Sequence, residues 1–432
     1  MVLKPRGDTV QFELKQPTSI GRSCSVPAKP FKISRLEVFE AYKRIKRNKG
    51  GEGCDGISLH DFEIHLKSKL YKIWNRLSSG SYMPPPVLRV EIIKNDGGIR
   101  PLGIPTVSDR IAQMVIKQRI EPGLDRIFHP DSYGYRSNKS ALDAIGTTRQ
   151  RCWKRAWVLD MDIKGFFDNI DHELLMLAVN KHVKHKWMRL YIERWLKASV
   201  QHRDGRSETR DAGTPQGGVI SPLLANLYLH YVFDMWVEKN WNGIQFARYA
   251  DDIVCHCITE GEAQRLLGVL KQRFNACGLT LHPEKTKIVY CKSINFRLEY
   301  PLVSFDFLGH TFKPRLIRTK TGVFMVGFTP SISRRAAKTI RSKVQDWKLI
   351  KHSQNDLTSI AKARRSAIAG WINFFGKYGR AEIKRTLYYI NEELVRWAKR
   401  KYKRLNTKRK AVRWLRGVRR REPNLFVHWE IG

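Results

Sequence analysis

Residues 246–255 read Phe-Ala-Arg-Tyr-Ala-Asp-Asp-Ile-Val-Cys, so that two adjacent aspartates, Asp251 and Asp252, stand between apolar runs. This pattern predicts two strands joined by a turn, with the acidic pair at its tip. Two like charges side by side repel each other, and a folded core gains nothing from them. The tetrapeptide alone fits equally well a site where divalent cations bridge carboxylates and a phosphate, or an ordinary Asp-rich hairpin turn.

The overall charge indicates the kind of partner. The chain has 432 residues, with 80 Lys and Arg against 40 Asp and Glu, a formal net charge of +40 and a pI near 10.2. A charge this extreme favours a polyanionic partner, nucleic acid by default. The basic residues are spread over the whole chain rather than set on one amphipathic helix, which disfavours a membrane surface.

The remaining composition bounds the class of protein. A hydrophobic fraction of 42% with 12 Trp indicates packed cores, and the length is sufficient for two or three domains. The seven cysteines are scattered, and no stretch is long and apolar enough to span a membrane. We therefore expect free thiols and a cytoplasmic, nucleic-acid-associated protein.

The periodicity of apolar residues predicts both helices and strands. Strands are expected at 87–93 and 156–163, and helices at 34–48, after Ser58, and at 108–128, 172–199, 221–232 and 261–277. Ser221 is expected to cap its helix, with Pro222 as the first helical residue. From residue 331 onward the composition shifts to 28 Lys and Arg against 7 Asp and Glu, so a domain boundary is expected near Thr329-Pro330.

A further carboxylate is expected to join the acidic pair. Asp162 ends the apolar strand Val158-Leu159-Asp160-Met161-Asp162, where a charge must be paired, metal-bound or at a strand edge. Asp160 points to the same face by strand alternation and is the alternative. Asp168 and Asp171 are expected to cap the helix that follows Ile170.

Several segments, taken in order, resemble the right-hand polymerase palm of reverse transcriptases, and more specifically the group II intron-encoded reverse transcriptases, or maturases. Together they cover roughly residues 40–310. The matching segments are Asn48-Lys49-Gly50 with Asp55-Gly56, Lys94 through Thr106, His129 through Arg136, Asp162 through Asp171, Gly213 through Leu229, Tyr249 through Asp252, Gly278-Leu279 with Glu284 through Lys287, and Phe307 through His310.

The resemblance implies an α+β fold: a right-hand polymerase with fingers and palm built from an antiparallel sheet plus helices, a helical thumb and a basic C-terminal extension. It divides the chain into an N-terminal arm and fingers at 1–110 and a palm at 111–329 with some fingers elements interleaved. A thumb or maturase-specific domain follows at 330–398, and a basic nucleic-acid-binding tail at 399–432.

The resemblance also implies the roles of individual residues. Asp162, Ile163 and Asp251 would hold two Mg²⁺ ions, for which Mn²⁺ could substitute, with Asp252 as a further catalytic carboxylate. Around the incoming nucleotide it places Lys94, Arg100, Gln216 and Gly217, with Phe167 rejecting ribonucleotides and Lys285 protonating pyrophosphate. Without the resemblance, Lys94 and Arg100 read as a solvated basic turn, Phe167 as core packing and Lys285 as a surface lysine.

The last part of the chain carries two further features. Phe307-Leu308-Gly309 resembles a turn that contacts the primer, although a buried strand end explains the same letters. Gly370 through Phe375 resembles the maturase-specific motif, although those aromatic residues equally suit a helical core. Between Arg396 and Arg421 there are 14 basic residues and no acidic ones, which favours backbone contacts to nucleic acid. Those proposed to bind are Arg413, Arg416, Arg419, Arg420 and Arg421.

The sequence therefore predicts an RNA-directed DNA polymerase that copies group II intron RNA into cDNA and binds that RNA to assist splicing and mobility. Its partners would be the intron RNA, an RNA template with a DNA primer, dNTPs and target DNA, with the protein a monomer or homodimer and no membrane involved. The chain shows no C-terminal Cys and His pairs at metal spacing, so an endonuclease-lacking type is expected. The alternatives are a maturase that only binds RNA, an RNA-dependent RNA polymerase, and a related reverse transcriptase with a role such as defence.

Overall fold

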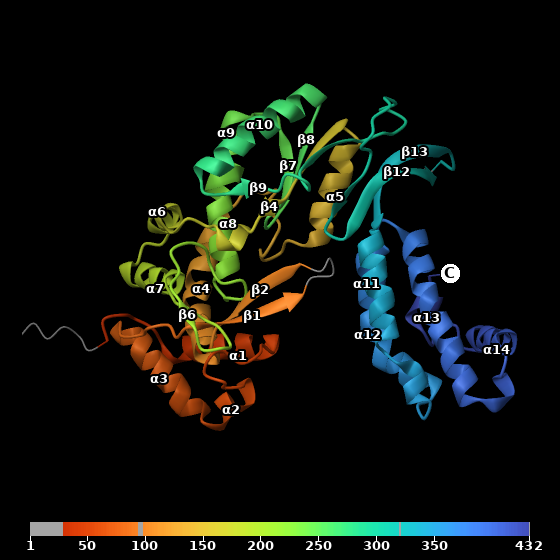
Figure 1. The fold of residues 1–432 in the computed structure, drawn as a ribbon, viewed down its shortest axis with the longest axis horizontal. Coiled ribbons are helices and arrows are strands. Elements are labelled where there is room, and N and C mark those ends of the chain that lie inside the picture. Colours follow the sequence, from red (N-terminus) through yellow and green to blue (C-terminus); the bar gives the residue numbers. More distant parts are fainter. Residues whose placement is uncertain (1–28, 94–97, 319–320, 432) are drawn as a thin grey trace, which may run out of the picture.

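A computed structural model describes residues 29–93, 98–318 and 321–431. Lys94 and residues 95–97 of the predicted turn lie outside the described residues, as does the predicted N-terminal arm up to residue 28. Figure 1 shows three parts: the first helices and a hairpin below, a central sheet with its helices above, and a group of helices at the right, in blue. The α+β class predicted from the sequence is confirmed.

The first part, the fingers, combines helices with a small sheet of strand order β2-β1-β5-β6. Its helices are α1 (Arg35–Asn48), α2 (Leu59–Ile64), α3 (Leu66–Ser79) and α4 (Val107–Ile127). Its strands are β1 (Val87–Ile93), β2 (Ile99–Ile104), β5 (Val200–Gln201) and β6 (Ser207–Glu208). Ser58 caps as predicted, but its helix is short, because His65 leaves the helical region and separates α2 from α3.

The palm is built on an antiparallel sheet of order β10-β3-β8-β7. Its strands are β3 (Trp157–Met161), β7 (Gln245–Tyr249), β8 (Asp252–Cys257) and β10 (Lys287–Tyr290). Leu159 belongs to the core that includes α10 (Glu260–Ala276), whereas Val158 belongs to a second core with α5 (Ala141–Cys152). Because both faces of β3 are covered, the strand needs apolar residues at successive positions, as its sequence has.

Further helices and turns complete the palm. They are the 3₁₀ turn Phe166–Asp168, α6 (His172–His182), α7 (Lys186–Leu196), α8 (Ser221–Leu229), the π-helical segment His230–Asp234 and α9 (Met235–Asn240), together with the small pair β4 (Ile163–Lys164) and β9 (Thr280–Leu281). The single helix predicted over 172–199 is two helices, since the chain leaves the helical conformation after His182.

Two of the predicted helix caps are wrong. Ser221 is the first residue of α8 rather than its cap, and its hydroxyl accepts a hydrogen bond from Thr214 Oγ1 at 2.8 Å. Asp168 belongs to the 3₁₀ turn and caps no helix. Asp171 does cap α6, accepting from the Leu174 amide at 2.8 Å.

A small antiparallel sheet leads from the palm into the thumb. Its strands β11 (Phe305–Phe307), β12 (His310–Arg318) and β13 (Phe324–Ile332) form an antiparallel sheet, and β13 runs through residues 329–330, where the domain boundary was proposed. The thumb helices are α11 (Arg334–Gln345), α12 (Leu357–Phe375), α13 (Arg380–Lys401) and α14 (Lys408–Arg421), with 3₁₀ turns at Leu349–His352, Lys403–Leu405 and Val427–Trp429.

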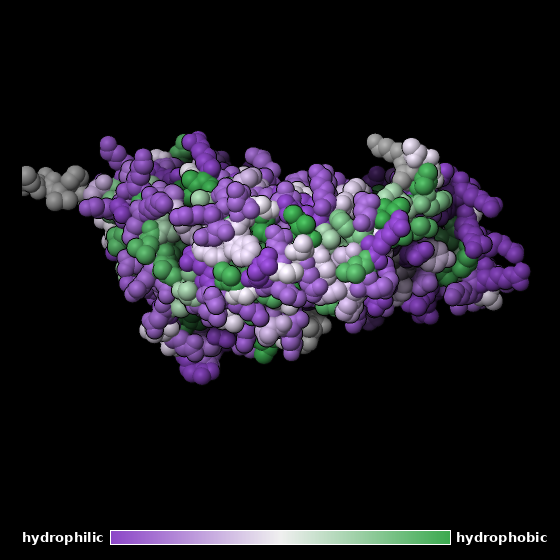
Figure 2. Space-filling view, turned by 90° about the horizontal axis from the view of Figure 1, so that it is seen from above, coloured by the Kyte–Doolittle hydropathy of each residue, from purple (hydrophilic) through white to green (hydrophobic). Residues whose placement is uncertain are grey.

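The basic C-terminal segment packs against the rest of the thumb. Ala411, Leu415 and Val418 of α14 are buried in the same core as Trp397 of α13, which is fully buried. Their spacing of three and four residues leaves the arginines of α14 on its other faces. Hydrophilic side chains cover much of the face of the molecule seen in Figure 2, including the thumb end. Among the described helices, none combines the length and apolar character needed to cross a membrane.

Candidate active site and nucleic-acid interface

Three carboxylates converge at one end of the palm sheet. Asp251 lies in the turn between β7 and β8, and Asp252 is the first residue of β8. Strand β3 pairs Met161 with Ile253 of β8, so Asp162, the next residue, lies at the same end of the sheet as Asp252. The Lys285 ammonium lies 3.3 Å from Asp162 Oδ2. The structure thus brings to one end of the sheet Asp162 and Asp251, which are separated by 89 positions in the chain.

The crowding of these groups shows in their protonation. Burial, the largest effect, together with the charges of Asp251 and Asp162, raises the pKa of Asp252 to about 7. Burial and the charge of Asp162 also raise the pKa of Asp251. Asp160, the alternative considered from sequence, is buried within β3, where its pKa rises to about 8. A carboxyl with that pKa is mostly neutral at pH 7, so Asp160 is a poor ligand for a cation.

Asp162 and Asp251 line a cavity of about 410 Å³ between the palm and β2. Seven of the residues predicted from sequence line it: Arg100, Asp162, Ile163, Phe167, Gln216, Asp251 and Lys285. Arg100 Nε donates to Gln216 Oε1 at 2.9 Å, and Gln216 Nε2 donates to Asp168 Oδ2 at 3.4 Å. Asp252 and Gly217 are not among the lining residues. The cavity therefore combines basic, carboxylate and amide side chains.

The loop that carries Gln216 is held close to β2. The Gly103 amide donates to the Gln216 carbonyl at 2.8 Å, and Gly217 adopts a φ of +126°. A Cβ at Gly217 would lie 2.4 Å from the Gly103 carbonyl oxygen, so only glycine permits this approach. On the other side, Gln113 Oε1 accepts from the amides of Val219 and Ile220 at 2.8 and 3.2 Å.

The aromatic pair after β4 is close-packed. Phe167 is 7% exposed and Phe166 2%, and their ring centroids are 5.4 Å apart in an edge-to-face arrangement. Both rings line the cavity, and Thr214 donates from its amide to the Phe167 carbonyl at 2.7 Å. Phe167 therefore packs in the core and borders the cavity at the same time.

Sequence reasoning missed the residues that hold the Asp251 turn. Arg248 of β7 is fully buried and makes a two-point ion pair with Asp234, at 2.6 and 2.7 Å. The same guanidinium donates to Asn226 Oδ1 at 3.0 Å and to the Ala250 carbonyl at 3.1 Å. Ala250 has a left-handed φ of +58°. The only signal in the sequence is an arginine within an otherwise apolar strand, and nothing there indicates its partner.

The proposed primer-contacting turn lies at the junction of palm and thumb. The Phe307 side chain is buried, whereas Leu308 is half-buried and Gly309 exposed, both with positive φ. The Gly309 carbonyl accepts from the Ser333 amide at 2.9 Å, and the His310 ring packs against Phe374 and Phe375 of α12. Any contact to a bound strand here therefore involves the backbone and Leu308 rather than the phenyl ring.

The arginines of α14 differ in their surroundings. Arg413, Arg416, Arg420 and Arg421 are exposed, whereas Arg419 is half-buried and donates to the Trp429 carbonyl at 2.9 Å. Arg413, Arg416 and Arg420 border an open, basic hollow with Lys408 and Arg409. The exposed arginines are thus free to meet phosphates, and Arg419 is partly engaged inside the protein.

The oxygen ligands at the end of the palm sheet suit a magnesium ion that keeps part of its water shell. Within the described residues, no three His, Cys, Asp or Glu side chains lie close enough to enclose an ion by themselves. Mg²⁺ usually takes only one or two protein carboxylates and completes its shell with water and substrate phosphates. Asp162 and Asp251 border one cavity with an ammonium drawn to Asp162, and this oxygen-only donor set fits that pattern.

Comparison with known proteins agrees with this fold. Residues 92–312 match the model of the reverse transcriptases (RNA-dependent DNA polymerases), and residues 337–415 match the group II intron maturase-specific domain. The chain is 32% identical over 328 residues to Protein YkfC of Escherichia coli (strain K12), covering 66% of this chain and 81% of that one.

Two further likenesses are either shorter or more distant in sequence. The group II intron-encoded protein LtrA of Lactococcus lactis subsp. cremoris is 37% identical over 193 residues, which are 44% of this chain and 32% of that protein. Among solved structures, telomerase from Candida albicans has a TM-score of 0.46 and 11% identity over 84% of this chain and 66% of that one, too distant to bear on function.

The palm sheet, its convergent carboxylates and the matched domain define the class of protein. The chain belongs to the reverse transcriptases, the RNA-dependent DNA polymerases. More particularly, it joins a reverse transcriptase domain to the maturase-specific domain of group II introns, as predicted from the sequence.

Proposed function

We propose that this reverse transcriptase copies group II intron RNA into cDNA by a two-Mg²⁺ mechanism, and that it binds the same RNA to assist splicing. The observation that carries the proposal is the shared cavity, in which Asp162 and Asp251 lie opposite Arg100 and Gln216. The maturase-specific match at residues 337–415 supports the splicing role. The proposed partners are the intron RNA, an RNA template with a DNA primer, dNTPs and target DNA, met in the cytoplasm.

In this proposal Asp162 and Asp251, with the Ile163 carbonyl, hold Mg²⁺, and Asp252 adds negative charge beside them. The bound ions would supply charge neutralisation at the phosphates and an activated primer hydroxyl. Arg100, which donates to Gln216 at 2.9 Å, would bind the triphosphate. Lys285, 3.3 Å from Asp162, would protonate the leaving pyrophosphate.

Phe167 would set the choice of sugar. Its ring borders the cavity and is packed against Phe166, so it cannot swing aside to admit a 2′-hydroxyl. Phe167→Ala should therefore raise ribonucleotide incorporation relative to dNTPs, whereas Phe39→Ala, at an exposed phenylalanine of α1, should not.

Primer extension tests the polymerase directly. An RNA template with a DNA primer and Mg²⁺ is supplied with dNTPs or rNTPs, comparing wild type, Asp251→Ala and Asp204→Ala, an exposed aspartate paired to Arg206. We expect extension with dNTPs only, abolished in Asp251→Ala and unchanged in Asp204→Ala. RNA affinity of Asp251→Ala should stay near wild type, because the carboxylate contributes chemistry rather than docking. Equal loss of extension and RNA binding would contradict the assignment.

The second candidate is a maturase that binds RNA without polymerising. The exposed arginines of α14 and the maturase-specific domain support this candidate as well as they support the first. A pure binder, however, has no evident use for Asp162 and Asp251 brought into one cavity with Arg100. Tight RNA binding and stimulated splicing with no extension by the wild type would select this candidate.

A further inference from the structure

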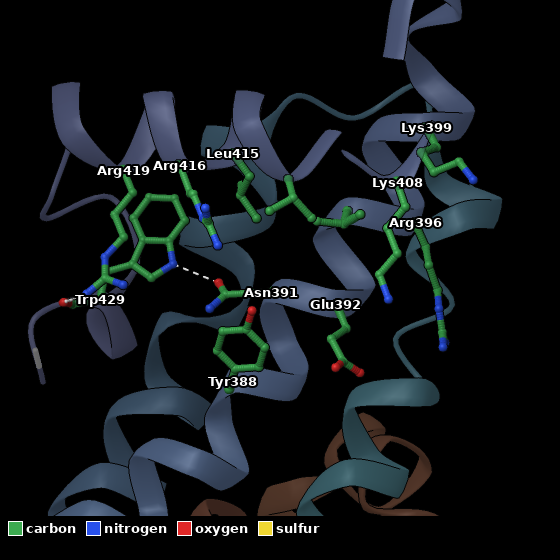
Figure 3. A pocket seen from close by; sticks show the side chains of 12 residues that line it. Tyr388, Asn391, Glu392, Arg396, Lys399, Lys408, Leu415, Arg416, Arg419 and Trp429 are labelled. Carbon is green, nitrogen blue, oxygen red and sulfur yellow. Dashed lines mark hydrogen bonds between the residues drawn. The ribbon is translucent and has the colours of Figure 1, made fainter. Parts of the chain in front are cut away.

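The thumb contains a pocket that lies apart from the catalytic cavity, between α13 and α14. Its volume is about 400 Å³, within the range that small ligands occupy. In Figure 1 these two helices form the outer edge of the thumb. Figure 3 looks into the pocket: Tyr388, Asn391 and Glu392 project from α13, and Leu415, Arg416 and Lys408 from α14, into the same space.

The floor and one end of the pocket are apolar and fixed. Leu415 and Val412 of α14 line it, and Trp429 closes one end. Trp429 Nε1 donates to Asn391 Oδ1 at 2.8 Å, which fixes the indole in place. At the mouth, the Tyr388 ring is 57% exposed, unusually open for a large aromatic side chain. An open ring over an apolar floor is a surface on which a planar group can stack.

The polar groups around this floor are of two kinds. Lys399, Lys408 and Arg416 border the pocket, and none makes a hydrogen bond or ion pair with another residue in the described part of the chain. Glu392 also borders it and makes no side-chain hydrogen bond or salt bridge among the described residues. Arg396 lines the same pocket, and its pKa is raised by Glu393 and, to a smaller degree, by Glu392. The three cations suit a phosphate, whereas a carboxylate suits an amino-group donor, such as the exocyclic amine of cytosine.

A single ligand class satisfies all of these groups. A free phosphate would leave the aromatic ring and apolar floor unused, and an apolar peptide would leave three cations and a carboxylate without partners. A nucleotide offers a planar base, an amino donor and a phosphate together. The base must also be unpaired, because in a duplex its faces are stacked and its amino group is already hydrogen-bonded.

We propose that the α13–α14 pocket captures one unpaired base of bound RNA, with the base on Tyr388, its amino group toward Glu392, and neighbouring RNA phosphates on Lys399 and Lys408 at one end and on Arg416 at the other. The inference deepens the proposed function, since it rests on the chain binding RNA through this domain. It adds that the thumb distinguishes single-stranded RNA, such as a loop or bulge, from a uniform duplex.

The test maps contacts and measures affinity with the full chain. The probe is a single-stranded oligocytidine RNA of about 12 nucleotides, within the usual site sizes for such proteins, with 5-iodocytidine at internal positions for light-induced crosslinking. We expect a crosslink on the peptide that contains Tyr388. Val412→Trp, which fills the pocket without removing a charge, should eliminate this crosslink.

Affinities are compared with those for an RNA duplex of the same length. Tyr388→Ala and Val412→Trp should each weaken single-strand binding about tenfold, in the range measured for one base–aromatic stack, and change duplex binding less than about twofold. Tyr71→Ala, at a tyrosine of similar exposure on α3, should change neither.

Two results would overturn the proposal: a wild type that gives no crosslink within α13 or α14, or variants that lose single-strand and duplex binding equally. Circular dichroism of each variant checks the thumb fold, and the wild-type crosslink stands without any variant. Primer extension by the wild type is measured alongside, so that a failure of the polymerase assignment is seen separately from a failure of the pocket.

Discussion

Replacing Asp234 by alanine should destabilise the palm strongly, because it leaves a buried charge alone. Arg248 and Asp234 are both 0% exposed and are joined by two short hydrogen bonds, at 2.6 and 2.7 Å. Removing one partner of such a pair costs about 3–5 kcal/mol. For a domain of this size, 1 kcal/mol lowers the melting temperature by roughly 2–4 °C, so the expected fall is roughly 6–20 °C.

The same substitution should slow primer extension by the molecules that remain folded. Arg248 also donates to the Ala250 carbonyl, next to Asp251, and Ala250 holds a left-handed backbone that costs about 1–2 kcal/mol for a non-glycine residue. Without Asp234, the guanidinium loses its fixed orientation and the turn loses this support. RNA affinity should remain, because Asp234 lies inside the palm and away from the surface.

The assay combines thermal melting followed by circular dichroism with single-turnover extension at a temperature well below both transitions. Asp204→Ala is the matched control, since its ion pair with Arg206 is exposed and its removal should leave both measurements unchanged. A fall in melting temperature of under about 2 °C for Asp234→Ala would refute the energetic reasoning. A normal extension rate would refute the role of the pair in holding the turn.

Three further outcomes follow from particular contacts. Gly217→Ala should destabilise by about 1–3 kcal/mol and impair extension, whereas Gly205→Ala, at a similar positive φ but with open space around it, should leave extension intact in the same assay. Replacing Arg413, Arg416 and Arg420 together by glutamine should reduce the slope of log affinity against log salt by about 2 on single-stranded RNA; an unchanged slope would remove α14 from the interface. Burial lowers the pKa of His428 to about 3 from an ordinary value near 6.5. As the pH falls, protons therefore bind the unfolded chain first. The stability that is present above pH 6.5 should be lost as the pH falls toward 3, and the loss should be smaller in His428→Gln. An equal fall in the melting temperatures of the two proteins between pH 7 and 4.5 would contradict this.

Much of the fold could be predicted because it depends on local patterns. The continuous apolar run of β3 indicated a strand covered on both faces, and Ser58 and Asp171 indicated the helix starts that they cap. The breaks within helices could not be predicted, since neither His65 nor residues 183–185 contain the glycine or proline that usually marks one. Ser221 was misread because its hydroxyl bonds to Thr214 in the preceding loop, a contact set by loop closure rather than by helix propensity.

The candidate site was predictable where its residues bear the chemistry themselves. Asp162 and Asp251 stand out as charges at the ends of apolar strands, and the structure brings them to one cavity with Arg100 and Gln216. Asp168 was misread as a cap because its partners are distant in the sequence. Gln216 donates a hydrogen bond to its carboxylate. Burial raises the pKa of Asp168, and the charges of Arg210, Arg89 and Arg100 oppose this rise. Proximity between such residues is a property of the folded chain, which no local pattern records.

The residues that hold the two loops of the candidate site could not be predicted from the sequence. Each of the two loops at the candidate site is held by a buried polar side chain from another element: Gln113 of α4 binds the 219–220 amides, and Arg248 binds the Ala250 carbonyl. Each holder is in turn fixed by a buried carboxylate, Asp109 for Gln113 and Asp234 for Arg248. A buried polar group is costly unless fully hydrogen-bonded, so each pair is retained only where both members are satisfied.

This arrangement explains how crowded carboxylates can be kept near one another. Burial, with the charges of neighbouring carboxylates as a smaller effect, raises the pKa of Asp251 and Asp252, so holding both groups in this turn is costly. Asp234 lies in the π-helical segment, whose wider turn is an energetically poor local conformation found mostly at functional sites. Here the segment presents Asp234 to Arg248, so a locally unfavourable turn in one helix supports a locally unfavourable turn between two strands. Asp234 and Arg248 are 14 residues apart in the sequence, and neither the π-helical segment nor the turn at Ala250 is favourable alone. We therefore expect the two turns to be lost together. A variant that disrupts the π-helical segment should lose primer extension even when Asp234 itself is retained.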